Sequence, residues 1–225
     1  MVKKKLTRPD LLLIAANMAP IIGAWFFGWD PKQIFMVYAL ETIIVGIFTL
    51  FKMAVVSAIR KKDALNYEGK NIQVPGVFIM LFFLFHYGMF VAIQTGMFIQ
   101  VSGISKEFHI GFFDFIIHWP RYLGADAYYM MAGFFISYGF AMYWNFLRRS
   151  QFRNFTLPQL MFQPYIRVFI QQFTVILGSM FLVFGAGKIF IVIFAAAKIF
   201  FEVFIDFDDI LKKSIAAELK KSGKQ

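Results

Sequence analysis

Apolar residues along the chain form six long segments that are separated by short polar connections. The segments run over residues 11–27, 34–59, 76–101, 128–147, 165–185 and 188–205. A helix rises about 1.5 Å per residue, so about 20 apolar residues span roughly 30 Å of bilayer hydrocarbon. Most of the segments reach this length, and the first is marginal. The pattern predicts an all-α membrane protein, built as a bundle of six transmembrane helices.

The connections indicate one transmembrane domain over residues 1–205 and an amphipathic, basic tail over residues 206–225. No Gly/Ser-rich or Pro-rich linker divides the chain. Residues 64–75 read as a modest loop, with Pro75 placed to begin the third helix. The longer connection over residues 102–126 is rich in aromatic residues, and we expect it to lie at the membrane interface. Its His109, Asp114 and His118 fit no compact metal-ligand spacing.

The positions of Lys and Arg predict the orientation. Sixteen of the 23 precede the first segment or follow the second, fourth and sixth, whereas four lie in the other connections. Cytoplasmic connections retain Lys and Arg during insertion, so both termini should be cytoplasmic, in a multi-pass protein of the inner cell membrane. The formal net charge of +10 is then explained by topology and by contact with anionic lipid headgroups. We expect the lipid bilayer as a partner and no nucleic acid.

Several residue types and motifs that enzymes use for catalysis are missing from the sequence. It has no cysteine, which excludes disulfides, thiolate catalysis and thiolate metal sites. The sequence also has no Ser or Cys nucleophile motif, Asp-rich metal loop or His-Glu-x-x-His pattern. These absences disfavour an enzyme.

Ionisable residues inside the predicted helices are the candidate functional groups, because they are costly against lipid and normally face the bundle interior. Lys52 and Arg167 lie near cytoplasmic helix ends, where long side chains reach water. Lys198 and Glu202 are one helical turn apart, and this spacing favours a pair with each other.

Glu41 and His86 lie at comparable depth in adjacent predicted helices. A carboxylate and an imidazole there could share a proton or supply two ligands to a divalent metal. A plain helix–helix hydrogen bond of His86 is the alternative. Further hydrogen-bonding groups are available at Tyr38, Tyr87, Gln94, Tyr138, Gln171 and Gln172.

Four short motifs carry a resemblance. Glu41–Gly46 with Lys52-Met53, Phe85–Phe90, Asn145–Leu147, and Pro164–Arg167 running into Ile176–Gly178 resemble an uncharacterised family of bacterial integral membrane proteins, a domain of unknown function. The resemblance extends from the second helix to Lys198 and Glu202.

That resemblance implies intramembrane histidines and hence a metal or haem-like site. This chain departs from it, because Gln94, Tyr138 and Gln172 stand where relatives carry His. Gln and Tyr hydrogen-bond but are poor ligands for transition metals. The resemblance therefore implies a shared polar cavity and weakens the metal or haem interpretation for this member.

The first hypothesis is a transporter or binding protein for a small solute, ion or proton, with its polar cavity open to the external side. Glu41 and His86 would handle protons or ligand, Gln94 and Gln172 would add hydrogen bonds, and Arg167, Lys198 and Glu202 would form the electrostatic frame. A second hypothesis is a membrane enzyme acting on lipid or quinone, with the same pair as acid and base. A third is a structural subunit whose polar groups only lock helices together.

Overall fold

The structure is a computed structural model that describes residues 6–60, 62–67, 70–107, 109 and 112–204. It is all-α apart from one small hairpin, and 86% helical. The longer helices are α1 (Arg8–Phe26), α2 (Pro31–Arg60), α3 (Gly76–Val101), α6 (Ala125–Ala141), α7 (Leu157–Val183) and α8 (Gly187–Ile199). Two π-helices, η2 (Met142–Leu147) and η4 (Phe200–Phe204), continue α6 and α8.

Each of the six apolar segments is helical over most of its described residues. Three stretches, Arg8–Phe26, Pro31–Ile59 and Gly76–Val101, are long and apolar enough to cross a membrane, judged on the described residues. The all-α prediction is therefore confirmed. Helix α7 begins at Leu157 instead of 165, because Thr156 and Gln159 cap its start and the helix continues through Pro164.

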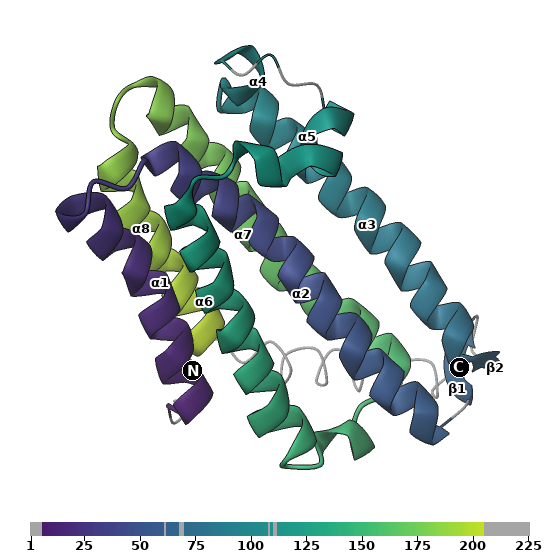
Figure 1. Cartoon of the computed structure of the whole chain (residues 1–225). Helices are drawn as coiled ribbons and strands as arrows, with labels where there is room; N and C mark the ends of the chain where they lie inside the picture. Colours follow the sequence, from purple (N-terminus) through teal and green to yellow (C-terminus); the bar gives the residue numbers. More distant parts are fainter. Residues whose placement is uncertain (1–5, 61, 68–69, 108, 110–111, 205–225) are drawn as a thin grey trace, which may run out of the picture.

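Helix α2 is the centre of the bundle. Figure 1 shows α2 and α7 crossing the middle, with α3 on one side and α1, α6 and α8 on the other. Residues 34–42 of α2 are buried on every side, as expected for a helix that is surrounded by others. In its most apolar window 72% of residues are buried, against 28% in α3, so α3 presents most of its surface outward.

Local capping explains where the first two helices begin. The Asp10 carboxylate accepts hydrogen bonds from the backbone N–H and the hydroxyl of Thr7, which forms the capping box of α1. Asp30 precedes α2 and accepts a hydrogen bond from the Lys32 N–H at 2.9 Å. Pro31 then occupies the first helical position, where its missing N–H costs nothing.

Two glycines permit close helix contacts. A Cβ at Gly178 of α7 would lie 2.0 Å from the Phe190 ring and 2.8 Å from that of Phe35. A Cβ at Gly46 of α2 would lie 2.5 Å from the Tyr87 ring of α3. These helices approach so closely because no side chain stands between them at these points.

The connections differ in part from the sequence expectation. Residues 64–75 are not a plain loop, because β1 (Lys62–Tyr67) and β2 (Lys70–Pro75) form an antiparallel hairpin. Pro75 directly precedes α3, as predicted. The long connection contains α4 (Ile104–Glu107), α5 (Phe112–His118) and the 3₁₀ turn η1 (Trp119–Tyr122). The predicted amphipathic tail lies outside the described residues.

One end of the bundle is basic. Helix α1 begins there and α2 and α6 end there, at the bottom of Figure 1, while α4 and α5 lie at the opposite end. Arg8, Lys52, Arg148 and Arg149 belong to this basic end. It corresponds to the side that the sequence predicts to be cytoplasmic.

Candidate functional site

A buried ion pair joins two helices at the centre of the bundle. Glu41 of α2 is fully buried, and the Lys198 ammonium of α8 donates to its Oε2 atom. The Tyr138 hydroxyl of α6 donates to the other oxygen, Oε1, at 2.7 Å. Both carboxylate oxygens are thus engaged by donors from separate helices. This three-residue cluster, Glu41, Tyr138 and Lys198, is called the buried triad below.

Aromatic rings complete the environment of the Lys198 ammonium. Its Nζ atom lies 4.3 Å from the ring centre of Phe134 and 5.0 Å from that of Tyr38. Such contacts attract a cation to the ring face, by about 2 kcal/mol or more when water is excluded. The side chain of Lys198 is only 2% exposed, so its charge is balanced by Glu41 and the rings rather than by water.

The structure joins residues that the sequence analysis had paired differently. Lys198 contacts Glu41, whereas we expected it to pair with Glu202, whose side chain lies outside the described part. Counting residues would have suggested the observed pair. Glu41 lies ten residues into α2 and Lys198 eleven into α8, about 15 Å and 16 Å from the same end of the bundle.

Glu41 and His86 are not brought together. His86 is exposed on α3, and its Nδ1 atom lies 2.7 Å from the Tyr165 hydroxyl of α7. Its neighbour Tyr87 faces α2 instead and donates a hydrogen bond to the Thr42 carbonyl at 2.7 Å. Adjacent residues on a helix point about 100° apart, so only one of the two can face α2.

The remaining predicted residues lie apart from the triad or outside the description. Gln94 is buried in α3, and its Oε1 atom has no hydrogen-bond partner in the described part of the chain. The side chains of Arg167 and Gln172 are not among those described. Within the described ranges, no group of three or more His, Asp or Glu residues is arranged to hold a metal ion.

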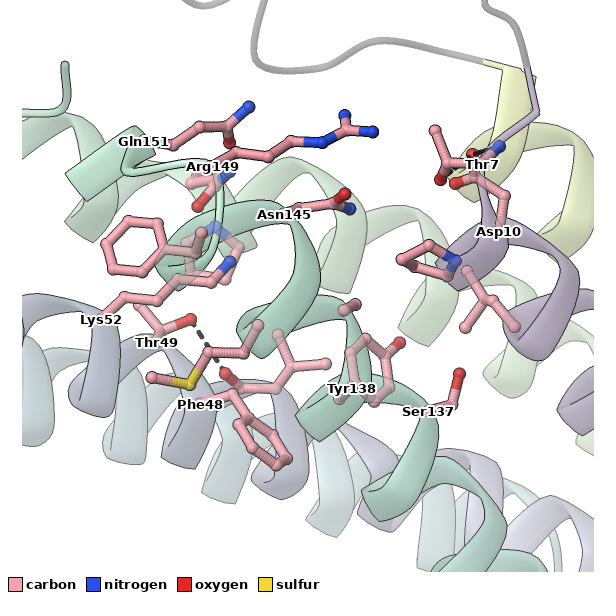
Figure 2. A pocket seen from close by; sticks show the side chains of 18 of the residues that line it. Thr7, Asp10, Phe48, Thr49, Lys52, Ser137, Tyr138, Asn145, Arg149 and Gln151 are labelled. Carbon is pink, nitrogen blue, oxygen red and sulfur yellow. Dashed lines mark hydrogen bonds between the residues drawn. The ribbon is translucent and has the colours of Figure 1, made fainter. Parts of the chain in front are cut away.

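A cavity of about 560 Å³ opens at the basic end of the bundle (Figure 2). Tyr138 of the buried triad lies at its inner end. Tyr138 lines this cavity and also donates to Glu41, so it links the cavity to the ion pair. The sequence analysis expected a cavity open to the opposite, external side. Figure 2 shows Thr7 and Asp10 on one side of the cavity, Lys52, Arg149 and Gln151 on the other, and Ser137 beside Tyr138.

The walls of this cavity carry buried hydrogen-bonding atoms that have no partner among the described residues. Ser137 is 3% exposed, and its Oγ atom has no partner among the described residues. The buried Oδ1 atom of Asn145 is likewise without one there. Asn145 belongs to the π-helix η2, a local widening of the helix that is frequent at functional sites. Buried polar atoms are normally satisfied, so these two are available to a ligand or to water.

A second polar cluster lies at the opposite end of the bundle. Asp114 of α5 accepts a hydrogen bond from the Tyr122 hydroxyl, and its Oδ1 atom lies 2.8 Å from Nδ1 of His118. The bond from Tyr122, followed by that from His118, lowers the pKa of Asp114 below its usual 3.8. The bond to Asp114 raises the pKa of Tyr122 above 10.0. This exposed cluster joins α5 to η1 and is separate from the triad.

Comparison with known proteins gives a family and no function. No curated protein matches the chain, and no solved structure matches it. A family model described as a family of unknown function, DUF6498, matches residues 2–223. The match covers almost all of the 225 residues, including the triad and the cavity. The chain therefore belongs to the DUF6498 family of unknown function.

Proposed function

We propose that the protein is a multi-pass protein of the inner cell membrane that binds a small polar solute in the cavity of the basic end and moves it together with a proton. One observation carries the proposal: Tyr138 lines the cavity and hydrogen-bonds Glu41, whose other oxygen is held by Lys198. The cavity would receive the solute, and the buried triad would sense it.

The proton step follows from the chemistry of the triad. Glu41 and Lys198 balance each other in a water-poor interior, so a proton added to Glu41 would leave Lys198 as an unbalanced buried cation. Release of Lys198 and rearrangement of α8 against α2 would relieve this cost. Tyr138 is the group placed to transfer the proton, since its hydroxyl both donates and accepts.

The six-span topology with cytoplasmic termini is part of the proposal. Its support is the three membrane-length helices, the apolar character of α6, α7 and α8, and the gathering of Lys and Arg in alternate connections. In this orientation the cavity faces the cytoplasm.

Cysteine labelling tests whether the cavity is open to water, because the chain has no cysteine of its own. Ala141→Cys places a thiol in the cavity wall, and Ala127→Cys places one in the buried core of the same helix. We expect a charged methanethiosulfonate reagent added to inside-out vesicles to modify Ala141→Cys and not Ala127→Cys. Equal protection of both thiols in folded protein would mean a closed polar core, as in a purely structural subunit.

Proton movement tests the role of the triad. Proteoliposomes filled with a pH-sensitive dye would be challenged with small carboxylates, amino acids and polyols. A solute that changes the internal pH through wild type should fail with Glu41→Gln and with Tyr138→Phe. Tyr165→Phe, which removes a hydroxyl bonded to His86 outside the cavity, is the matched control. Unchanged flux in Glu41→Gln would refute the assignment.

A further inference from the structure

Beside the cavity, the basic end carries a second pocket of a different kind. It has a volume of about 450 Å³ and is lined by Arg8, Trp144, Arg148 and Arg149. Arg8 comes from the first turn of α1, and the other three come from η2 and the turn that follows it. Arg149 also lines the cavity, so the two pockets are neighbours. The pocket is therefore lined by three guanidinium groups and one indole ring.

Trp144 holds two of the arginines in place. The Arg148 guanidinium carbon lies 4.1 Å from the centre of the Trp144 ring system, and that of Arg8 lies 5.2 Å from it. Stacking on an aromatic face orients a guanidinium without using its N–H donors. The donors of both arginines are therefore available for an anion.

Among the described residues, no carboxylate pairs with these arginines. Arg8, Arg148 and Arg149 are exposed, and within the described part of the chain none of them forms an ion pair. The nearby Asp10 is buried and accepts hydrogen bonds from Thr7 in the capping box, on the cavity side. Three neighbouring cations with no carboxylate partner in the described ranges repel one another, and a bound anion would remove this repulsion.

The surroundings indicate which anion. The pocket lies where α1 begins and α6 ends, the level at which a membrane helix meets lipid headgroups, and tryptophan is enriched at that level. Next to it along the chain, the exposed side chains of Leu11, Leu12 and Tyr143 offer apolar surface. An anion with attached acyl chains satisfies both parts of this surface, whereas a free anion satisfies only the arginines.

We infer that the pocket formed by Arg8, Trp144, Arg148 and Arg149 binds the phosphate of an anionic glycerophospholipid of the cytoplasmic leaflet. Arg8 and Arg148, both held against the Trp144 ring, supply the phosphate donors, and the acyl chains lie along Leu11, Leu12 and Tyr143. The bound lipid would join the start of α1 to the end of α6, two helices that contact each other and both line the cavity.

Lipid titration followed by native mass spectrometry tests the inference on the full chain in detergent. Phosphatidylglycerol should bind wild type at least tenfold more tightly than phosphatidylcholine with the same acyl chains. Arg8→Gln/Arg148→Gln should lose about 25-fold in phosphatidylglycerol affinity, since one cation contributes about fivefold, or about 1 kcal/mol, at a membrane surface. The control Arg153→Gln/Lys188→Gln removes the same charge outside the pocket and should bind as wild type does.

Three results would overturn the inference. Equal phosphatidylglycerol affinity in Arg8→Gln/Arg148→Gln and in the control would show that only total charge matters. Equal affinity of wild type for the two lipids would show that the pocket does not distinguish an anionic headgroup from a zwitterionic one. Displacement of the lipid by an equal concentration of glycerol phosphate would assign the pocket to a soluble anion. Trp144→Phe provides a second variant that keeps all charges, and weaker binding is expected there too.

Discussion

Replacing one partner of the Glu41–Lys198 ion pair should destabilise the protein more than replacing both. The three variants are Glu41→Gln, Lys198→Met and the double variant Glu41→Gln/Lys198→Met. In Glu41→Gln a buried ammonium keeps only the rings of Phe134 and Tyr38 as described partners for its charge. In Lys198→Met a buried carboxylate keeps the Tyr138 hydroxyl but loses its cation. The double variant has no charge left to balance.

The burial of the pair sets the magnitude. The two side chains are 2% and 0% exposed, so neither charge is solvated when its partner is removed. Breaking a buried pair from one side costs about 3–5 kcal/mol, whereas replacing both partners by uncharged groups is often neutral. We expect each single variant to lose about 3 kcal/mol or more, the double variant to lose less than either, and a coupling energy of about 3 kcal/mol.

Thermal unfolding in detergent, followed by tryptophan fluorescence, measures these differences. For a chain of this length about 3 kcal/mol corresponds to a shift of about 6–12 °C in Tm. A reversible titration with a denaturing detergent gives the free energies for the double-mutant cycle. Additive losses, with the double variant the least stable of the three, would refute a direct interaction between Glu41 and Lys198.

Four further predictions test other contacts by the same unfolding assay or by titration. Tyr138→Phe should lower the free energy of unfolding by about 1.5–3 kcal/mol, because it removes a hydrogen bond to a charged group. A loss of stability no greater than that in Tyr165→Phe would contradict this prediction. Gly178→Ala should be strongly destabilising, because its methyl group would lie 2.0 Å from Phe190, whereas Gly88→Ala, with nothing within 4 Å, should be neutral or gain about 0.5–1 kcal/mol. The Tyr122 phenol should titrate above pH 10 and return toward 10 in Asp114→Asn, and the difference absorbance of the phenolate measures this. Because the pKa of Asp114 is lowered on folding, its stabilising contribution should be present above pH 3.8 and disappear as the pH falls through the lower, folded value.

Hydropathy was enough to predict the helices, because burial in lipid or protein requires long apolar segments whatever the tertiary contacts are. It misplaced the start of α7, since Pro164 resembles a helix start while the capping residues Thr156 and Gln159 lie earlier. The hairpin in residues 62–75 was missed, because its residues alternate weakly and the two residues between its strands are Glu68-Gly69, not the Asn-Gly or Asp-Gly pair that most strongly signals a hairpin.

The site was harder to predict than the fold. Glu41, Tyr138 and Lys198 were all candidates, yet their contact joins α2, α6 and α8, helices that are distant in the sequence. Local spacing favoured Lys198 with Glu202, and adjacent helices favoured Glu41 with His86. Which side chains meet depends on how each helix is rotated about its own axis. Helix α3 is apolar on all sides, so its sequence gives little indication of which face turns inward. Tyr87 faces α2, so its neighbour His86 does not.

The position of the buried triad suggests how to test whether it serves function or only structure. If the polar groups served only to lock helices together, apolar side chains of similar volume would serve as well or better, since a buried ion pair is rarely a net gain in stability. The pair instead adjoins the polar cavity through Tyr138. A stable Glu41→Gln/Lys198→Met protein that no longer couples solute to proton movement in proteoliposomes is therefore the expected result. Full retention of that movement in the stable double variant would assign the triad to structure alone.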